Sequence, residues 1–251
     1  MAAAPVIRVE GLEAGYGPLT VLKDVSFEVR RGEVFVVLGG SGCGKTTLLR
    51  QMIGLETPRA GRIWFGGDEL TAGDPAGRER IRRRFGVMFQ SGALFGSMTV
   101  AENVMLPLEV FTRLPPDARQ LAALLKLRLV ALDHACDRLP SQLSGGMVKR
   151  AGIARAMALD PEILFLDEPS AGLDPVTSAG VDRLIRQLAE TLGITFVVVT
   201  HELASIYAIA DRALMLDASV RGVLASGPPA ELRDRSPDER VQRFFRRQAA
   251  D

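Results

Sequence analysis

The sequence has few cysteines and almost no net charge. Its 251 residues include two cysteines, Cys43 and Cys136, which are too few for a disulfide framework and fit a reducing compartment. Acidic and basic side chains nearly balance and leave a net charge of +1. Because no overall positive potential attracts nucleic acid, we expect no nucleic-acid partner.

The sequence also lacks a long uninterrupted apolar run. The stretch from residue 121 to residue 132 is broken by Lys126 and Arg128, so it does not read as a membrane span. Residues 1–5 lack the basic start and apolar core of a signal peptide. We therefore expect a cytoplasmic protein whose contact with any membrane is made through a partner.

A glycine-rich loop lies between an apolar run, residues 34–38, and a helical pattern, residues 47–53. It matches G-x-x-x-x-G-K-[ST] in the strand–loop–helix context that distinguishes a phosphate-binding loop from a chance match. Glycines let backbone N–H groups converge on an anion, and the helix start adds the positive end of its dipole. The alternative, a glycine-rich turn with a lysine by chance, leaves the flanking strand and helix unexplained. The predicted phosphate site consists of Gly39, Gly40, Ser41, Gly42, Cys43, Gly44, Lys45 and Thr46.

Acidic residues end another expected strand, residues 163–168. Asp167 fits the shell of a Mg²⁺ ion together with the hydroxyl of Thr46, because Mg²⁺ prefers oxygen ligands. Glu168, one position further and pointing the other way along a strand, is the candidate general base. The alternative interpretation makes both acids solvated strand ends.

Gln90 follows an expected strand at residues 85–89, and His201 lies at the polar exit of another at residues 196–201; both strands are predicted to be buried. The amide oxygen of Gln90 could contact the metal or the attacking water. His201 could hold that water, or Glu168, in place. Taken alone, such a glutamine is more often a plain loop residue and such a histidine more often structural, as we interpret His134.

A second anion site is predicted at residues 143–147. Ser144 is a favourable N-cap, and Gly145 and Gly146 expose backbone N–H groups at the start of a helical pattern that runs to residue 159. This site lies far along the chain from the phosphate loop. Both could serve one nucleotide only if two copies of the chain faced each other head to tail.

Tyr16 lies between two glycines in an expected loop upstream of the phosphate loop. An aromatic ring there could stack on a purine base, an interaction worth about 1–3 kcal/mol. A packing tyrosine is the ordinary alternative.

Strand and helix patterns alternate along most of the chain and predict an α/β fold with a mainly parallel sheet. Residues 91–160 instead carry helical patterns at 100–106, 117–130 and 145–159, separated by prolines, and are interpreted as an inserted helical lobe. Further helices are expected at residues 79–84, 177–192 and 238–247. The remaining expected strands are residues 6–10, 25–29, 62–65, 213–216 and 220–225.

Together these motifs resemble the ATP-binding cassettes of the ABC transporter family, in that family's order and over nearly the whole chain. Tyr16 corresponds to the aromatic loop, Gln90 to the Q-loop, residues 143–147 to the signature and residues 170–174 to the D-loop. The resemblance implies one domain over residues 1–251. Residues 1–90 and 161–235 would form a P-loop NTPase (RecA-like) core with an antiparallel β-subdomain, residues 91–160 a helical subdomain, and residues 236–251 a C-terminal helix and tail.

The resemblance also implies ATP and Mg²⁺ as ligands and a homodimer that sandwiches two ATP molecules. Each ATP would lie between the phosphate loop of one copy and Ser144, Gly145 and Gly146 of the other. Thr47 and Asp174 would complete the nucleotide-binding set. Mg²⁺ would be held by Thr46, Gln90 and Asp167, and hydrolysis would depend on Glu168, His201 and Gln90.

One departure from the family pattern is Met147, where the signature usually has glutamine. With residues 90–95, this ending is similar to the ATPase subunits of MCE-type phospholipid transporters. That likeness implies a membrane permease as partner, an MCE protein and a small regulatory subunit in the complex, and a place on the cytoplasmic face of the inner (plasma) membrane. The alternatives are an ABC ATPase for another substrate, or a soluble cassette protein acting on DNA or ribosomes.

Residues 91–107 carry several apolar side chains directly after Gln90. We expect Val104 and Leu106 to belong to the core of the helical lobe. Phe95 and Met98 are predicted to form an exposed groove for a short cytoplasmic helix of the permease.

Overall fold

The computed structural model describes residues 5–247. Residues 1–4 and 248–251, which include most of the segment predicted not to be a signal peptide and the end of the predicted tail, lie outside the described residues. The strands are β1 (Ile7–Tyr16), β2 (Leu19–Val29), β3 (Val34–Gly39), β4 (Ala60–Phe65), β5 (Asp68–Glu69), β6 (Phe85–Met88), β7 (Ile163–Asp167), β8 (Thr195–Val199), β9 (Arg212–Asp217) and β10 (Gly222–Gly227). The helices are α1 (Lys45–Met52), α2 (Pro75–Arg82), α3 (Val100–Phe111), α4 (Pro116–Leu129), α5 (Gly145–Ala156), α6 (Pro175–Leu192), α7 (Leu203–Ile209), α8 (Pro229–Arg235) and α9 (Glu239–Arg246), with 3₁₀ turns at Asp133–Ala135 and Pro140–Gln142.

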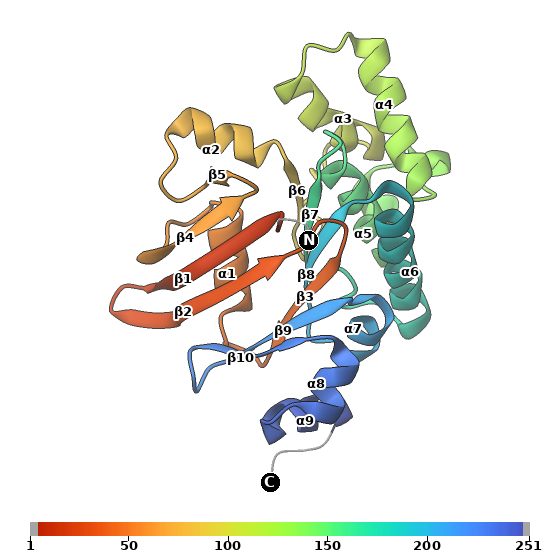
Figure 1. Cartoon of the computed structure of the whole chain (residues 1–251). Coiled ribbons are helices and arrows are strands. Elements are labelled where there is room, and N and C mark those ends of the chain that lie inside the picture. The colour runs from red at the N-terminus through yellow and green to blue at the C-terminus, as the bar shows by residue number, and fades with distance from the viewer. Residues whose placement is uncertain (1–4, 248–251) are drawn as a thin grey trace.

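A six-stranded sheet forms the centre of the molecule, in the order β10-β9-β3-β8-β7-β6 (Figure 1). Five of its strands are parallel, and β10 pairs antiparallel with β9. β3, β7 and β8 are buried along their whole length, as expected for strands covered on both faces. The predicted α/β fold with a mainly parallel sheet is therefore confirmed.

A second, antiparallel sheet in the order β2-β1-β4-β5 covers one face of the central sheet, with α1 between them (Figure 1). Side chains alternate along β3, so Phe35 and Val37 face α1 and the small sheet while Val34, Val36 and Leu38 face the other side. This packing fixes the start of α1 relative to the end of β3.

The other face of the central sheet carries α6, α7 and the helices of the inserted segment. Val104, Ala123 and Leu127 of that segment are buried in the same apolar cluster as Val36 and Phe196 of the sheet. The helical segment therefore has no core of its own that is separate from the sheet.

Several expected elements differ from the observed ones for identifiable reasons. α3 continues through Pro107 to Phe111, although an internal proline costs about 3 kcal/mol, because buried side chains such as Leu108 hold its last turn. α2 begins at Pro75, four residues earlier than expected, because Asp74 caps it by accepting the N–H of Gly77 at 2.6 Å.

β6 was expected to be buried, but it is the edge strand of the sheet, and only Met88 in it is fully buried. Leu106, expected in the core of the helical lobe, is only half-buried, whereas Val104 is fully buried but in the core that the lobe shares with the sheet. Both errors arise because the presence of an apolar residue in the sequence does not show how much of its surface other elements will cover.

Among residues 5–247, none of the helices combines the length and the apolar character needed to cross a bilayer. α9, predicted as a terminal helix docked on the core, buries Val241 and Phe245. Both cysteines are free thiols.

Candidate functional site

The phosphate loop joins β3 to α1 at the carboxyl edge of the central sheet. Gly39 has a φ of +146°, and a Cβ there would lie 2.3 Å from the carbonyl oxygen of Leu216, so only glycine fits where the strand ends. Gly44 caps α1 with a φ of +102°. Gly40 and Gly42 face open space. The loop is thus closed toward β9 and open where an anion can reach its N–H groups and the start of α1.

Lys45 lies across this loop. Its Nζ donates hydrogen bonds to the carbonyl oxygens of Gly39, at 2.8 Å, and Gly40, at 2.9 Å. Charged phosphate oxygens are stronger acceptors than these carbonyls, so the ammonium group is well placed to bind them. The side chain of Cys43 is buried and burial raises the pKa of its thiol, so this residue offers the loop its backbone rather than its sulfur.

Thr46 and Asp167 line one small cavity of about 210 Å³ at the start of α1 and the end of β7. Burial raises the pKa of Asp167, and the nearby Glu168 charge raises it further. A hydroxyl and a carboxylate are oxygen donors that suit Mg²⁺, and a cation there would offset the unfavourable burial of the acid. The cavity is lined by Phe89 rather than by Gln90, so the structure brings together two of the three predicted metal ligands.

Glu168 is not the last residue of a strand, as the alternation argument assumed. β7 ends at Asp167, and Glu168 has a φ of +49°, a left-handed conformation that costs a non-glycine residue about 1–2 kcal/mol. Its N–H donates to the carbonyl oxygen of Val199 on β8 at 2.8 Å. The direction of its carboxylate is therefore set by this backbone conformation.

The carboxylate of Glu168 meets His201, which follows the adjacent strand β8. Glu168 Oε1 lies 2.8 Å from His201 Nδ1, so the predicted pair is brought together. Glu168 Oε2 is buried and has no partner among residues 5–247. One oxygen is thus held by the histidine, while the other is left without a hydrogen-bond partner among the described residues.

Tyr16 is the last residue of β1 and not part of a loop, because the β1–β2 pairing continues up to Tyr16 opposite Leu19. Its ring is 47% exposed, and its hydroxyl lies 3.3 Å from Thr47 Oγ1 on α1. This contact ties the end of the hairpin to the phosphate-loop helix. It leaves a face of the ring open to solvent, and stacking on a base stays a prediction.

The signature residues begin α5 in the helical segment. Ser144 caps the helix by accepting the N–H of Met147 at 3.4 Å, and both Ser144 and Gly145 are exposed. Gly146 is buried, and a Cβ there would lie 2.4 Å from Thr177 Cγ2, so close packing of α5 on α6 alone explains this glycine. Within residues 5–247, no hydrogen bond joins the signature to the phosphate loop.

Asp174 has a structural role that its sequence motif did not indicate. It caps α6, and its Oδ1 accepts the N–H groups of Val176 at 3.0 Å and Thr177 at 3.1 Å. Hydrogen bonds from Thr177 lower the pKa of Asp174 below its usual range. The cap accounts for an aspartate at this position, and its contact with nucleotide stays a prediction.

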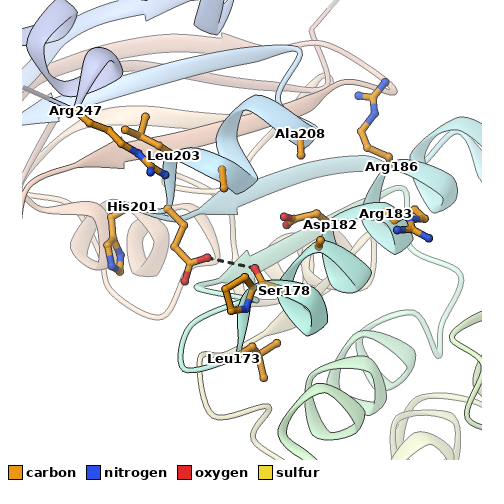
Figure 2. A pocket seen from close by; sticks show the side chains of 13 residues that line it. Leu173, Ser178, Asp182, Arg183, Arg186, His201, Leu203, Ala208 and Arg247 are labelled. Carbon is orange, nitrogen blue, oxygen red and sulfur yellow. Dashed lines mark hydrogen bonds between the residues drawn. The ribbon is translucent and has the colours of Figure 1, made fainter.

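A pocket of about 780 Å³ lies beside His201, between α6 and α7 (Figure 2). Ser178 on α6 donates a hydrogen bond to Glu202 across it at 3.3 Å. Asp182 is buried on the same helix, accepts a hydrogen bond from Ser205 at 2.9 Å and leaves Oδ1 without a partner among the described residues. Burial raises the pKa of Asp182. None of these acids was predicted as a site residue.

Two buried polar residues near the site were also missed. Lys149 on α5 donates to the carbonyl oxygens of Gln90 and Glu168, and burial lowers the pKa of its ammonium group. Asn103 on α3 is fully buried and exchanges hydrogen bonds with the N–H and carbonyl of Phe95 at 2.8 and 3.1 Å. Neither residue belongs to a sequence motif, and no hydrophobic periodicity distinguishes buried Lys149 from the polar residues beside it.

Comparisons with known proteins agree with this geometry. The family model described as "ABC transporter" matches residues 22–171. The chain is 40% identical over 229 residues to the intermembrane phospholipid transport system ATP-binding protein MlaF of Escherichia coli, covering 91% of this chain and 84% of that protein. It is 42% identical over 202 residues to the methionine import ATP-binding protein MetN of Rhodospirillum rubrum, covering 80% of this chain and 57% of that protein.

A solved structure shows the same architecture in a nucleotide-bound dimer. It is the dimeric, post-hydrolysis state of an ATP-binding cassette bound to ADP and Pi, with a TM-score of 0.79, 30% sequence identity, and coverage of 88% of this chain and 98% of that one. The family model covers more than half of the chain, and the fold carries its phosphate loop, acids and histidine at one sheet edge. The chain therefore belongs to the ABC transporter family of ATPases.

Proposed function

We propose that two copies of this chain bind and hydrolyse two ATP molecules at shared sites and thereby drive phospholipid transport by a membrane permease. The observation that carries the hydrolytic part is the contact between buried Glu168 and exposed His201, next to the cavity of Thr46 and Asp167. The phosphate loop and Lys45 would hold the β- and γ-phosphates.

In this mechanism Glu168 is the general base. Its carboxylate accepts a proton from the water that attacks the γ-phosphorus, while His201 contacts Oε1 and holds the direction of the carboxylate. The bond from the γ-phosphorus to the bridging oxygen breaks, giving ADP and inorganic phosphate. Mg²⁺, held by Thr46 and Asp167, would neutralise charge on the phosphate oxygens.

The signature would complete the site of a second copy. Ser144 and Gly145 are exposed at the start of α5, where backbone N–H groups and the helix dipole favour an anion. Because they make no hydrogen bond to the phosphate loop of their own chain within residues 5–247, a head-to-tail dimer gives them an anion to bind. The structural neighbour described above is a dimer bound to ADP and Pi.

The permease is proposed to dock on the helical segment. A groove of about 640 Å³ there is lined by Met98 and Met105 and otherwise mainly by polar residues of α3 and α4, and Phe95, which is 49% exposed, lies outside this lining. The two methionines and the exposed Phe95 suit the apolar face of a short helix, and the polar lining suits its hydrophilic side. This contact would place the chain on the cytoplasmic face of the inner membrane.

Phospholipid is favoured as the transported substrate because the MlaF relative matches over 84% of its length, and because the signature ends in Met147. An MCE protein and a small regulatory subunit would then belong to the complex. Import of another substrate is the second candidate, since the methionine-import relative is 42% identical over 202 residues.

The test of the substrate class is purification of the native complex with identification of its membrane subunits and bound lipid. An MCE protein with a permease and copurified phospholipid would support the proposal. A permease that binds an amino acid, with no MCE protein, would support the second candidate instead.

The shared site is tested by mixing two inactive variants, Lys45→Ala and Ser144→Arg. In a mixed dimer one site carries both changes and the other carries neither, so activity should return on mixing. If each site were complete within one chain, mixing would restore nothing. Mixing Lys45→Ala with itself at the same total concentration is the matched control.

A further inference from the structure

Lys149 is a buried lysine on the helix that begins at the signature. It is 6% exposed and lies five residues after Ser144. A buried ammonium group is stable only where its hydrogen bonds are satisfied. Its Nζ donates to two backbone carbonyl oxygens, those of Gln90 and of Glu168, the second at 3.0 Å. The acids that face it from other elements are Glu168, Asp167 and Glu202.

The bond to Glu168 acts on a peptide in an uncommon conformation. Glu168 has a φ of +49°, and such a residue keeps it only when its surroundings fix both sides of the backbone. On one side its N–H is bonded to Val199; on the other its carbonyl accepts the N–H of Ala171 at 3.2 Å and the ammonium of Lys149. Lys149 therefore helps to hold the conformation that directs the Glu168 carboxylate to His201.

The bond to Gln90 belongs to a continuous contact between α5 and the segment after β6. A Cβ on Gly92 would lie 3.1 Å from Val148 Cγ1, and one on Gly152 would lie 3.2 Å from Gly92 Cα, so the two backbones are close. Further along, Arg155 donates to the carbonyl oxygen of Ala93. A shift of α5 would therefore displace the segment that carries Gln90.

We propose that Lys149 is a positioning residue that fixes the backbones of Gln90 and Glu168 relative to each other and to the signature helix. A movement of the signature onto a partner's nucleotide is then transmitted through one ammonium group to both hydrolytic side chains. This rests on the role proposed above for Glu168 and on the hydrolytic role that the sequence motif predicts for Gln90. Lys149 acts through these backbones, without contacting the reacting atoms itself.

The test compares Lys149→Met, Lys149→Gln and Lys149→Arg in the full-length chain. Methionine keeps the length of the side chain but removes both hydrogen bonds, so kcat for ATP hydrolysis should fall about 10–100-fold while KM for ATP changes less than about threefold, as for a misplaced catalytic group. Arginine can donate to both carbonyls and should restore most of kcat. Glutamine keeps an N–H donor group, but this group is neutral and its side chain is one atom shorter, so kcat should lie between the two.

Arg150→Met is the matched control, because Arg150 is the next residue on the same helix and its Nη1 donates at 3.4 Å to the Val130 carbonyl, away from the catalytic backbones. It should leave kcat and KM unchanged. If Lys149→Met does not fold, the order of kcat among the folded variants, arginine above glutamine, decides the question.

Two results overturn the proposal. One is unchanged kcat in folded Lys149→Met or an arginine variant no better than glutamine. The other is a fall in activity that only follows the folded fraction measured by thermal unfolding, which would make Lys149 a purely structural residue. Glu168→Gln distinguishes failure of this proposal from failure of the proposed mechanism. If Glu168→Gln hydrolyses ATP normally, the general base is another residue. If Glu168→Gln is inactive while Lys149→Met is fully active, only the role of Lys149 is refuted.

Discussion

The edge of the central sheet and the surface of the helical segment are built in opposite ways. At the sheet edge, the ends of the buried parallel strands β3, β7 and β8 set the positions of the phosphate loop and the catalytic pair. In the helical segment, single buried polar side chains hold irregular backbone: Asn103 holds Phe95, and Lys149 holds Gln90. The catalytic groups thus depend mainly on strand geometry, while the irregular segments near the helices depend on single side-chain contacts, one of which, from Lys149, also reaches the carbonyl oxygen of Glu168.

The largest effect on ATP hydrolysis is expected from a change at the sheet edge, at Glu168. Removing its charge in Glu168→Gln should reduce the rate of ATP hydrolysis by about 10²–10⁴-fold, the usual contribution of a general base, because the amide cannot accept the water proton. Binding of ATP should persist and hold the dimer together, as measured by size-exclusion chromatography with ATP. Rapid turnover would place the base elsewhere. Glu190→Gln, on the exposed face of α6, should behave as wild type.

A change on the surface of the helical segment should instead spare ATP binding and reduce assembly with the permease. Phe95→Asp should leave ATP binding and folding intact, since Phe95 is half-exposed and Arg155, 4.9 Å from its ring centroid, can accept the new charge as a partner. Copurification with the permease should fall by about 30-fold or more, as for an aromatic residue central to an interface. Leu192→Asp, a similarly exposed residue at the end of α6, is the control and should keep assembly.

An unfolded Phe95→Asp protein would show instead that this residue belongs to the core. Undiminished assembly and transport would move the docking surface away from Phe95 and Met98.

A third change affects binding at the sheet edge without affecting the fold. Lys45→Ala removes charge-assisted hydrogen bonds to phosphate and should weaken ATP affinity roughly 10–100-fold, measured by fluorescence of a bound nucleotide analogue. Lys23→Ala, on the exposed side of β2, is the control. Equal affinity in both variants would contradict the assignment of the phosphate loop.

The smallest expected effect concerns Asp182 in the pocket beside His201. Burial raises its pKa in the folded state, so the folded protein takes up a proton before the unfolded chain does as the pH falls, and this group favours folding below its unfolded pKa, near 3.9. That contribution is lost as the pH rises through the folded pKa. Asp182→Asn should therefore raise Tm slightly at pH 7, by about 2 °C, and flatten its dependence on pH between 7 and 4.

Glu28→Gln, an exposed strand residue, should leave both the Tm and its pH dependence unchanged. A lower Tm in Asp182→Asn at pH 7 would mean that a bound cation, or a donor outside the described residues, stabilises the charged form.

The sequence-based predictions succeeded at the edge of the central sheet more than in the segments held by single side chains. Strand periodicity located β3, β7 and β8 and therefore the sheet edge, because a buried parallel strand is a continuous apolar run. The left-handed conformation of Glu168 was not predictable, because glutamate does not favour a positive φ. Its contact with His201 was expected only because both residues lie at the ends of strands of the same sheet.

Buried polar side chains that bond to irregular backbone segments are not marked by any hydrophobic periodicity in the sequence. Asparagine and lysine are usually exposed residue types, yet Asn103 and Lys149 are both buried because a neighbouring segment packs over them. Tyr16 was placed in a loop because glycines flank it, although pairing with β2 keeps it in a strand. Such cases depend on tertiary contacts that a local pattern does not contain.

The apolar cluster that joins the helical segment to the central sheet has a thermodynamic consequence. Because Val104 and Leu127 share one core with Val36 and Phe196, the segment cannot melt without exposing the sheet face to water. The chain should then unfold as one cooperative unit, with a single calorimetric transition and no stable excised fragment for residues 91–160. Any reorientation of the helices during turnover must therefore occur as a pivot within a packed interior, which limits its amplitude to what interlocking side chains allow.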